Sequence, residues 1–201
     1  MAFMEDAAFC EWLNEKQVTP VVNFRQLEVL RVPHLRERLT CTTHVYDMQG
    51  AVGYRNTAIY DAQGNACYKS WVIAAFVNLE TGRLSRISKE TMEQFHLNPP
   101  LEMTYGARKI VLPDAPMTPL EPFRVQRNDI DYNNHVNNAQ YIRMALEYLP
   151  DDFEVKGMRV EYKKPVMYGS TITPSIVYEA HAAYVVLAVD GAVCCVVEFT
   201  S

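Results

Sequence analysis

The sequence predicts an α+β fold made of two copies of one unit, in each of which an antiparallel sheet wraps around a central helix. Three observations predict it. Each half has one short helical pattern, several long apolar extended runs follow that helix, and the halves correspond at a constant offset. Pro33 interrupts the extended runs of the first half, and Pro165 does so 132 residues later. Because one helix covers little of a flat sheet, we expect each sheet to curl.

The second half carries the clearer pattern. Apolar side chains recur at spacings of three and four over residues 141–149, which predicts an amphipathic helix that ends at Pro150. The dipeptide Asp190-Gly191 is typical of a two-residue hairpin turn between strands. Extended runs are expected at 158–166, 170–180, 182–189 and 192–200.

The first half repeats this plan with a helix expected at about residues 4–16. A turn at 61–65 stands where Asp190-Gly191 stands in the other half. Extended runs are expected at 22–32, 36–48, 51–61 and 66–79.

These patterns divide the chain into a first unit, a linker and a second unit, at residues 1–87, 88–122 and 123–201. The middle segment is rich in proline, which is typical of a crossover linker, with one short helix expected at 89–95. The second unit opens with residues 123–136, whose counterparts in the first unit would fall before residue 5. The first unit is therefore expected to be N-terminally shortened.

Composition excludes several classes of function. The chain has 201 residues and a formal charge of −5, which argues against binding to nucleic acid or an anionic membrane. No apolar run reaches the ~20 residues of a membrane-spanning helix. The N-terminus carries acids where a signal peptide would carry positive charge, so a cytoplasmic protein is expected. The five cysteines form no CxxC pair and lack histidines at zinc-ligand spacing, so we expect neither metal nor disulfide.

Residues 128–138 are the most polar passage in the chain, with five asparagines, two acids and one histidine. They lie between an expected strand at 123–126 and the helix of the second unit. A purely structural interpretation is a loop with Asx turns whose Asn137 or Asn138 caps the helix. One or two asparagines suffice for that, so the remaining polar residues favour a catalytic role.

The catalytic interpretation is an acyl-transfer site. His135 can take a proton from water near neutral pH, and Asp131 can orient its imidazole or hold the water. Asn133 offers an amide to fix the water or a thioester carbonyl. The N–H groups at the helix N-terminus suit the oxyanion of an attacked carbonyl. The passage holds no serine or cysteine, so direct hydrolysis by water is favoured over a covalent intermediate.

The string DIDYNNHVNNAQYIRMALEYLP (129–150) resembles the D-x-D-x-N-x-H-V-N-N-x-x-Y signature of the acyl-acyl carrier protein thioesterases. Residues 71–87 and 160–164 extend this resemblance to both halves of the chain. It implies a tandem hotdog fold and hydrolysis of fatty acyl thioesters on acyl carrier protein, without metal or organic cofactor. It also implies that Asp131, Asn133 and His135 are catalytic, and that the first hotdog unit shapes the acyl pocket.

Two departures from the family pattern keep alternatives open. A family glutamate falls here on Pro165, and the cysteine that follows it in plant members falls on Val166, so the role of the glutamate is vacant. The shortened first unit would leave a sheet edge that a partner subunit of a homodimer could cover. The alternatives are an acyl-coenzyme A thioesterase of the hotdog superfamily and a non-catalytic acyl-binding module.

A basic cluster in the second unit also has two interpretations. It is either a solvated surface or a docking patch for an acidic carrier protein. Its members are Lys156, Arg159, Lys163 and Lys164.

Overall fold

The computed structural model describes residues 7–95 and 97–201. The chain forms two compact units, divided between Tyr105 and Gly106, and we describe each by itself as unit 1 and unit 2. The first turn of the helix expected at 4–16 falls outside the described residues. No helix of the described ranges is both long enough and apolar enough to cross a membrane. The helices are α1 (Ala7–Glu15), α2 (Lys89–Met92), the 3-10 turn η2 (Arg127–Asp129) and α3 (Asn138–Leu146).

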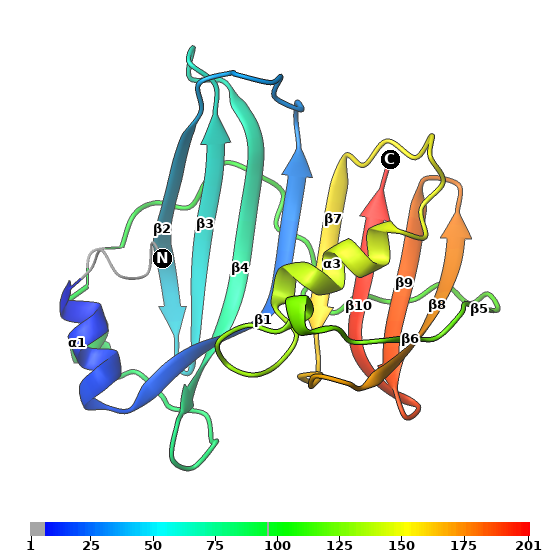
Figure 1. The fold of residues 1–201 in the computed structure, drawn as a ribbon. Coiled ribbons are helices and arrows are strands. Elements are labelled where there is room, and N and C mark those ends of the chain that lie inside the picture. The colour runs from blue at the N-terminus through cyan, green and yellow to red at the C-terminus, as the bar shows by residue number, and fades with distance from the viewer. Residues whose placement is uncertain (1–6, 96) are drawn as a thin grey trace. The chain divides into compact units, whose positions relative to one another are not determined.

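Unit 1 contains four long antiparallel strands in the order β2-β3-β4-β1 (Figure 1). The expected turn at 61–65 joins β3 to β4, and Gly64 provides its positive φ of 85°. The strands are β1 (Val18–Val29), β2 (Thr40–Gln49), β3 (Val52–Tyr60) and β4 (Ala66–Asn78).

Both faces of the unit 1 sheet are covered, because β4 is apolar on both sides. Helix α1 packs Phe9 against Phe76, with the two ring centroids 6.0 Å apart. On the opposite face Phe24 and Trp71 form a second cluster, whose rings lie 5.2 Å apart. The fully buried Asn56 accepts a hydrogen bond there from the Leu101 N–H, which fixes residues 101–105 on this face.

Unit 2 contains an antiparallel sheet in the order β7-β10-β9-β8-β5, and β6 also pairs with β8. The expected hairpin at Asp190-Gly191 is confirmed: both residues have positive φ, 49° and 75°, as a type I′ turn requires. The strands are β5 (Thr118–Pro119), β6 (Phe123–Arg124), β7 (Gly157–Tyr162), β8 (Thr171–Glu179), β9 (Ala182–Val189) and β10 (Ala192–Thr200).

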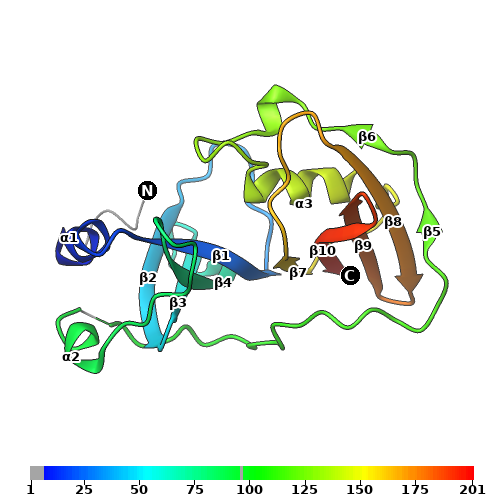
Figure 2. The ribbon, with the colours of Figure 1, turned by 90° about the horizontal axis from the view of Figure 1, so that it is seen from below.

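Helix α3 lies in the concavity of the unit 2 strands, and β9 and β10 touch it most (Figure 2). It buries Tyr141, Met144 and Ala145, as the spacing of these residues predicts. The helix ends at Leu146 rather than at residue 149. The N–H groups of Tyr148 and Leu149 donate to carbonyls three residues back instead of four, so the chain continues to Pro150 as a tighter turn.

The proline-rich segment 88–122 packs on both units. Phe95 belongs to the α1 core cluster of unit 1. Ile110 packs on unit 2 against Val177 and Val196, and the following Thr118 pairs with Ile176 in the sheet. In this segment the expected helix at 89–95 is limited to the four residues of α2.

Candidate active site

The polar passage before α3 folds as a small hairpin. Ile130 pairs with Val136, and the Asp131 N–H donates to the His135 carbonyl at 3.0 Å. The Asn134 N–H donates back to the Asp131 carbonyl at 3.0 Å. Asn134 itself takes a φ of 64°, a left-handed conformation that asparagine tolerates better than most residues. The hairpin therefore brings residues 131 and 135 face to face across its two arms.

His135 and Asp131 form the titratable pair of this hairpin. His135 Nδ1 lies 3.9 Å from Asp131 Oδ1, and the two side chains are 35% and 15% exposed. His135 Nδ1 also lies 3.3 Å from the Val136 carbonyl oxygen. A carbonyl can only accept, so Nδ1 carries the hydrogen in this contact. In this tautomer of a neutral imidazole, Nε2 carries no hydrogen and can accept a proton.

Asn133 lies at the exposed tip of the hairpin. Its backbone N–H donates to Asp131 Oδ1 at 2.8 Å, which makes an Asx turn. The structural interpretation of this passage is thus correct in part, and Asn137 caps α3 through a 2.9 Å bond from the Ala139 N–H. The structure brings Asp131 and His135 together, whereas the side chain of Asn133 is exposed at the hairpin tip.

The N-terminus of α3 follows the hairpin directly. The N–H groups of Ala139 and Gln140 are occupied by the side-chain and main-chain oxygens of Asn137. Within the described ranges the Asn138 N–H has no hydrogen-bond acceptor. This donor, three residues after His135 and at the positive end of the helix, is suited to stabilise an oxyanion.

A second segment lies against the hairpin, the connection 163–170 between β7 and β8, which we call the strap. The Val136 N–H donates to the Val166 carbonyl at 2.8 Å, and His135 forms a bridge with Met167. Pro165 is exposed and Val166 is 2% exposed. The strap thus lies against the hairpin through the Val166 carbonyl and the bridge between Met167 and His135.

Sequence reasoning missed Asp129. This carboxylate is 4% exposed and receives hydrogen bonds from the Gln126 N–H and from Arg143 of α3, both at 2.8 Å. The Asn137 N–H donates to the main-chain carbonyl oxygen of Asp129. Asp129 therefore connects the start of the hairpin to α3. The signal that could have found it is the spacing of Gln126 and Asp129, since an N-cap and its third residue exchange hydrogen bonds.

The buried cysteines of unit 2 are poor nucleophiles. Cys195 is completely buried and Cys194 is 4% exposed. Burial raises the pKa of both thiols, most strongly that of Cys195, so both stay protonated near neutral pH. In the described ranges, no three His, Cys, Asp or Glu side chains are grouped so that they could hold a metal ion.

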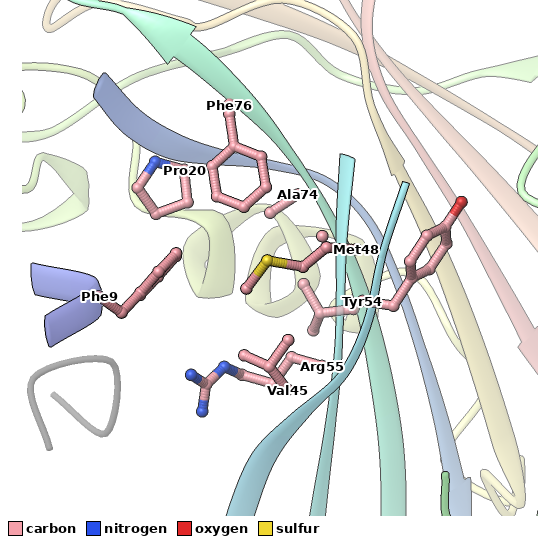
Figure 3. A pocket seen from close by; sticks show the side chains of 10 residues that line it. Phe9, Pro20, Val45, Met48, Tyr54, Arg55, Ala74 and Phe76 are labelled. Atoms are coloured by element: carbon pink, nitrogen blue, oxygen red, sulfur yellow. The ribbon is translucent and has the colours of Figure 1, made fainter. Parts of the chain in front are cut away.

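In unit 1 an apolar cavity lies between α1 and the sheet (Figure 3). Its open volume is about 10 Å³, the space of a single water molecule, so its lining nearly fills it. The side chains of Phe9, Met48 and Phe76 point into it. The complete lining is Phe9, Pro20, Val45, Met48, Gly53, Tyr54, Arg55, Val72, Ala74 and Phe76.

The basic cluster of unit 2 is largely neutralised. Lys163 Nζ lies 2.8 Å from Glu161 Oε1, and the Arg159 guanidinium forms an ion pair with the Glu198 carboxylate. Lys156 lies 3.8 Å from Glu154. These ion pairs offset the charges of Lys156, Arg159 and Lys163, which disfavours a docking patch for an acidic carrier protein. The pair of Arg159 and Glu198 is largely buried, since Glu198 is 6% exposed.

Comparisons with known proteins match both halves of the chain. The family of acyl-ACP thioesterase N-terminal domains matches residues 2–95, and that of the C-terminal domains matches residues 117–193. Here ACP denotes acyl carrier protein. The chloroplastic acyl-(acyl-carrier-protein) hydrolase FATB3 of Cuphea viscosissima is 28% identical over 156 residues, which are 72% of this chain and 37% of that protein. The chain thus spans somewhat over a third of the length of the curated relatives that it matches.

Two solved structures share the fold. An acyl-ACP thioesterase from Bacteroides thetaiotaomicron superposes with a TM-score of 0.83 at 21% identity, over 94% of this chain and 78% of that one. A 12:0-ACP thioesterase from Umbellularia californica gives a TM-score of 0.82 at 18% identity, over 99% of this chain and 81% of that one. These likenesses confirm the tandem hotdog fold. Since the family matches together cover residues of both units, the chain belongs to the acyl-ACP thioesterase family.

Proposed function

We propose that this chain hydrolyses fatty acyl thioesters on acyl carrier protein and releases the free fatty acid. The observation that supports this most is the hairpin, in which the His135 imidazole lies beside the Asp131 carboxylate, three residues before an open helix N–H group. A base, a carboxylate to stabilise its cation and an oxyanion donor are the groups that attack by water requires.

The reaction that these groups support has two steps. His135 Nε2 removes a proton from water while the water oxygen attacks the thioester carbonyl carbon. The negative charge that forms on the carbonyl oxygen is stabilised by the Asn138 N–H, and the Asp131 carboxylate stabilises the imidazolium. The oxyanion then reforms the carbonyl, the C–S bond breaks, and the imidazolium returns its proton to the departing thiolate.

Asn133 is proposed as the residue that holds the water or the thioester carbonyl. Its exposed position at the hairpin tip leaves its amide accessible to a substrate. Its backbone bond to Asp131 couples the placement of the two residues. No cofactor is assigned a role in this scheme, because imidazole, carboxylate and backbone N–H suffice for hydrolysis of a thioester.

A second candidate function is acyl binding without turnover. The observation that favours it is the strap, where Pro165 and Val166 offer no carboxylate beside His135. A binding module would retain a fatty acyl ligand unchanged.

Two further expectations stay predictions: that the chain forms a homodimer, and that it works in the cytoplasm.

The test is thiol release from matched series of acyl-ACP and acyl-coenzyme A thioesters. We expect turnover on the carrier-protein series, and a fall in kcat of roughly 10²- to 10⁴-fold for His135→Ala. The matched control is His34→Ala, which removes an exposed histidine of unit 1 and is expected to leave kcat unchanged. Equal or faster turnover of the coenzyme A series would reassign the substrate. Absence of turnover by folded wild type on every ester would leave the binding module.

A further inference from the structure

The buried hydroxyl of Tyr141 holds the strap against α3. Tyr141 is 3% exposed, and its hydroxyl oxygen accepts a hydrogen bond of 3.1 Å from the Val166 N–H. Val166 is 2% exposed, so this N–H group has no access to water and depends on a protein acceptor. The Tyr141 hydroxyl therefore satisfies the buried Val166 N–H and stabilises the strap in its buried position.

The same strap residue carries the hydrogen bond that fixes the hairpin. The Val166 carbonyl accepts from the Val136 N–H at 2.8 Å, and the next strap residue, Met167, is bridged to His135. Tyr141, Val166 and Val136 thus form a continuous path of hydrogen bonds and peptide units that ends at the backbone of His135. Two of its links join segments far apart in the sequence.

The two strap residues on this path, Pro165 and Val166, carry no polar side chain. Pro165 has no N–H group, and the side chain of Val166 cannot donate or accept a hydrogen bond. Pro165 and Val166 can therefore influence His135 only through the positions of their backbone groups. Tyr141 is the side chain that sets this position from α3. Burial raises the pKa of its hydroxyl, and the nearby Asp131 carboxylate adds a smaller shift in the same direction.

We propose that Tyr141 is a positioning residue for His135, which acts through the strap backbone and keeps the imidazole aligned with Asp131. This inference rests on the proposed thioester hydrolysis. The residue touches neither the water nor the thioester in this scheme, so its loss should affect the rate of the chemical step more than substrate binding.

The test is Tyr141→Phe, which removes one oxygen and keeps the ring. We expect kcat to fall roughly tenfold to a hundredfold with KM little changed, because small displacements of a catalytic group have effects of this size. The matched control is Tyr178→Phe, whose hydroxyl donates to the Tyr148 carbonyl at the other end of α3. This control should keep kcat within about twofold of wild type, since it removes a tyrosine hydroxyl bond outside the path to His135.

A second readout does not depend on activity. The ring signals of His135 are followed by NMR as the pH is changed, in wild type and in Tyr141→Phe. We expect the midpoint of the His135 titration to differ between the two proteins, and to stay at the wild-type value in Tyr178→Phe. If wild type has no thioesterase activity, the proposed function fails while this titration still tests the positioning role.

Two results would overturn the inference. One is a folded Tyr141→Phe protein with wild-type kcat and a wild-type His135 titration. The other needs no variant and applies even if Tyr141→Phe does not fold: amide hydrogen exchange at Val166 in wild type. We expect this amide to be strongly protected, since it is buried and donates to the hydroxyl. Exchange at the rate of an unstructured amide would contradict the path.

Discussion

Arg143 Nη2 lies 2.8 Å from Asp129 Oδ1, so an arginine of α3 neutralises a carboxylate that is almost completely buried. The arginine side chain is 58% exposed, whereas that of the aspartate is 5% exposed. Asp129 precedes the hairpin of residues 130–136, and the ion pair therefore joins the hairpin to α3. Removal of the arginine leaves a buried charge with fewer partners.

We expect Arg143→Met to lower the free energy of unfolding of unit 2 by about 1 to 3 kcal/mol, the usual cost of a buried polar group that loses a partner. The measurement is urea denaturation followed by circular dichroism. The control is Arg38→Met, which replaces an exposed arginine of unit 1. A stability of Arg143→Met equal to that of wild type would mean that the Gln126 N–H alone satisfies Asp129.

Gly53 and Phe76 are in closer contact than any side chain at position 53 would permit. A Cβ atom on Gly53 would lie 2.9 Å from Phe76 Cζ, so the ring rests directly on β3. We expect Gly53→Ala to destabilise unit 1 by about 1 to 3 kcal/mol, as overpacking of a core does. The measurement is urea denaturation followed by tryptophan fluorescence, since Trp12 and Trp71 both lie in unit 1.

The smaller Phe76→Leu side chain should relieve this clash. The double variant Gly53→Ala with Phe76→Leu is therefore expected to be destabilised by less than the sum of the two single variants. Additive effects would show that the alanine is accommodated elsewhere, for example by a shift of β3.

Cysteine accessibility differs strongly along the chain. Cys41 is exposed, whereas Cys67, Cys194 and Cys195 are buried. With iodoacetamide at pH 8, we expect native protein to be alkylated rapidly at Cys41 and slowly at Cys194 and Cys195, whose pKa values burial raises. Peptide mass spectrometry measures the extent at each site. Rapid labelling of Cys195 in folded protein would show that β10 opens, and would revive a covalent route.

Acid should destabilise unit 1 through Asp61. The N–H groups of Asn65 and Gln63 donate to its Oδ1 at 2.8 and 3.0 Å, and these bonds together with Arg31 hold the pKa of the carboxyl below its ordinary value of 3.8. The folded pKa is the lower one, so this stabilisation is complete above the ordinary pKa and is lost as the pH falls through the folded value.

We therefore expect the free energy of unfolding of unit 1 to decrease as the pH is lowered from 5 to 3, and to decrease less in Asp61→Asn. Tryptophan fluorescence in urea at each pH measures it. The control is Glu80→Gln, an exposed carboxylate beyond the end of β4, which should retain the wild-type pH dependence. Identical slopes for Asp61→Asn and wild type would assign the acid sensitivity to other carboxyls, Glu37 first among them.

Local patterns in the sequence determined much of the fold. Three elements are specified by residues that lie close together in the sequence: the helix that contains Tyr141, the hairpin at Asp190-Gly191 and the turn at 61–65. The structure confirms all three. The ends of elements were less accurate. Strand β7 stops at Tyr162 instead of residue 166. The backbone N–H groups of Lys163 and Lys164 both donate to the Cys194 carbonyl, because the chain leaves the regular pairing of the sheet there.

The sequence by itself also predicts which passage carries the chemistry, the one that holds Asp131, Asn133 and His135, and their catalytic role stays a prediction. Tertiary structure alone decided what surrounds them. Arg143 reaches Asp129 across 14 residues, and the Val166 N–H reaches the Tyr141 hydroxyl across 25. These partners are chosen by where folding buries a carboxylate or an N–H group that must then be satisfied. Such a requirement arises only once the strap and α3 have packed together, so no local pattern in the sequence records it.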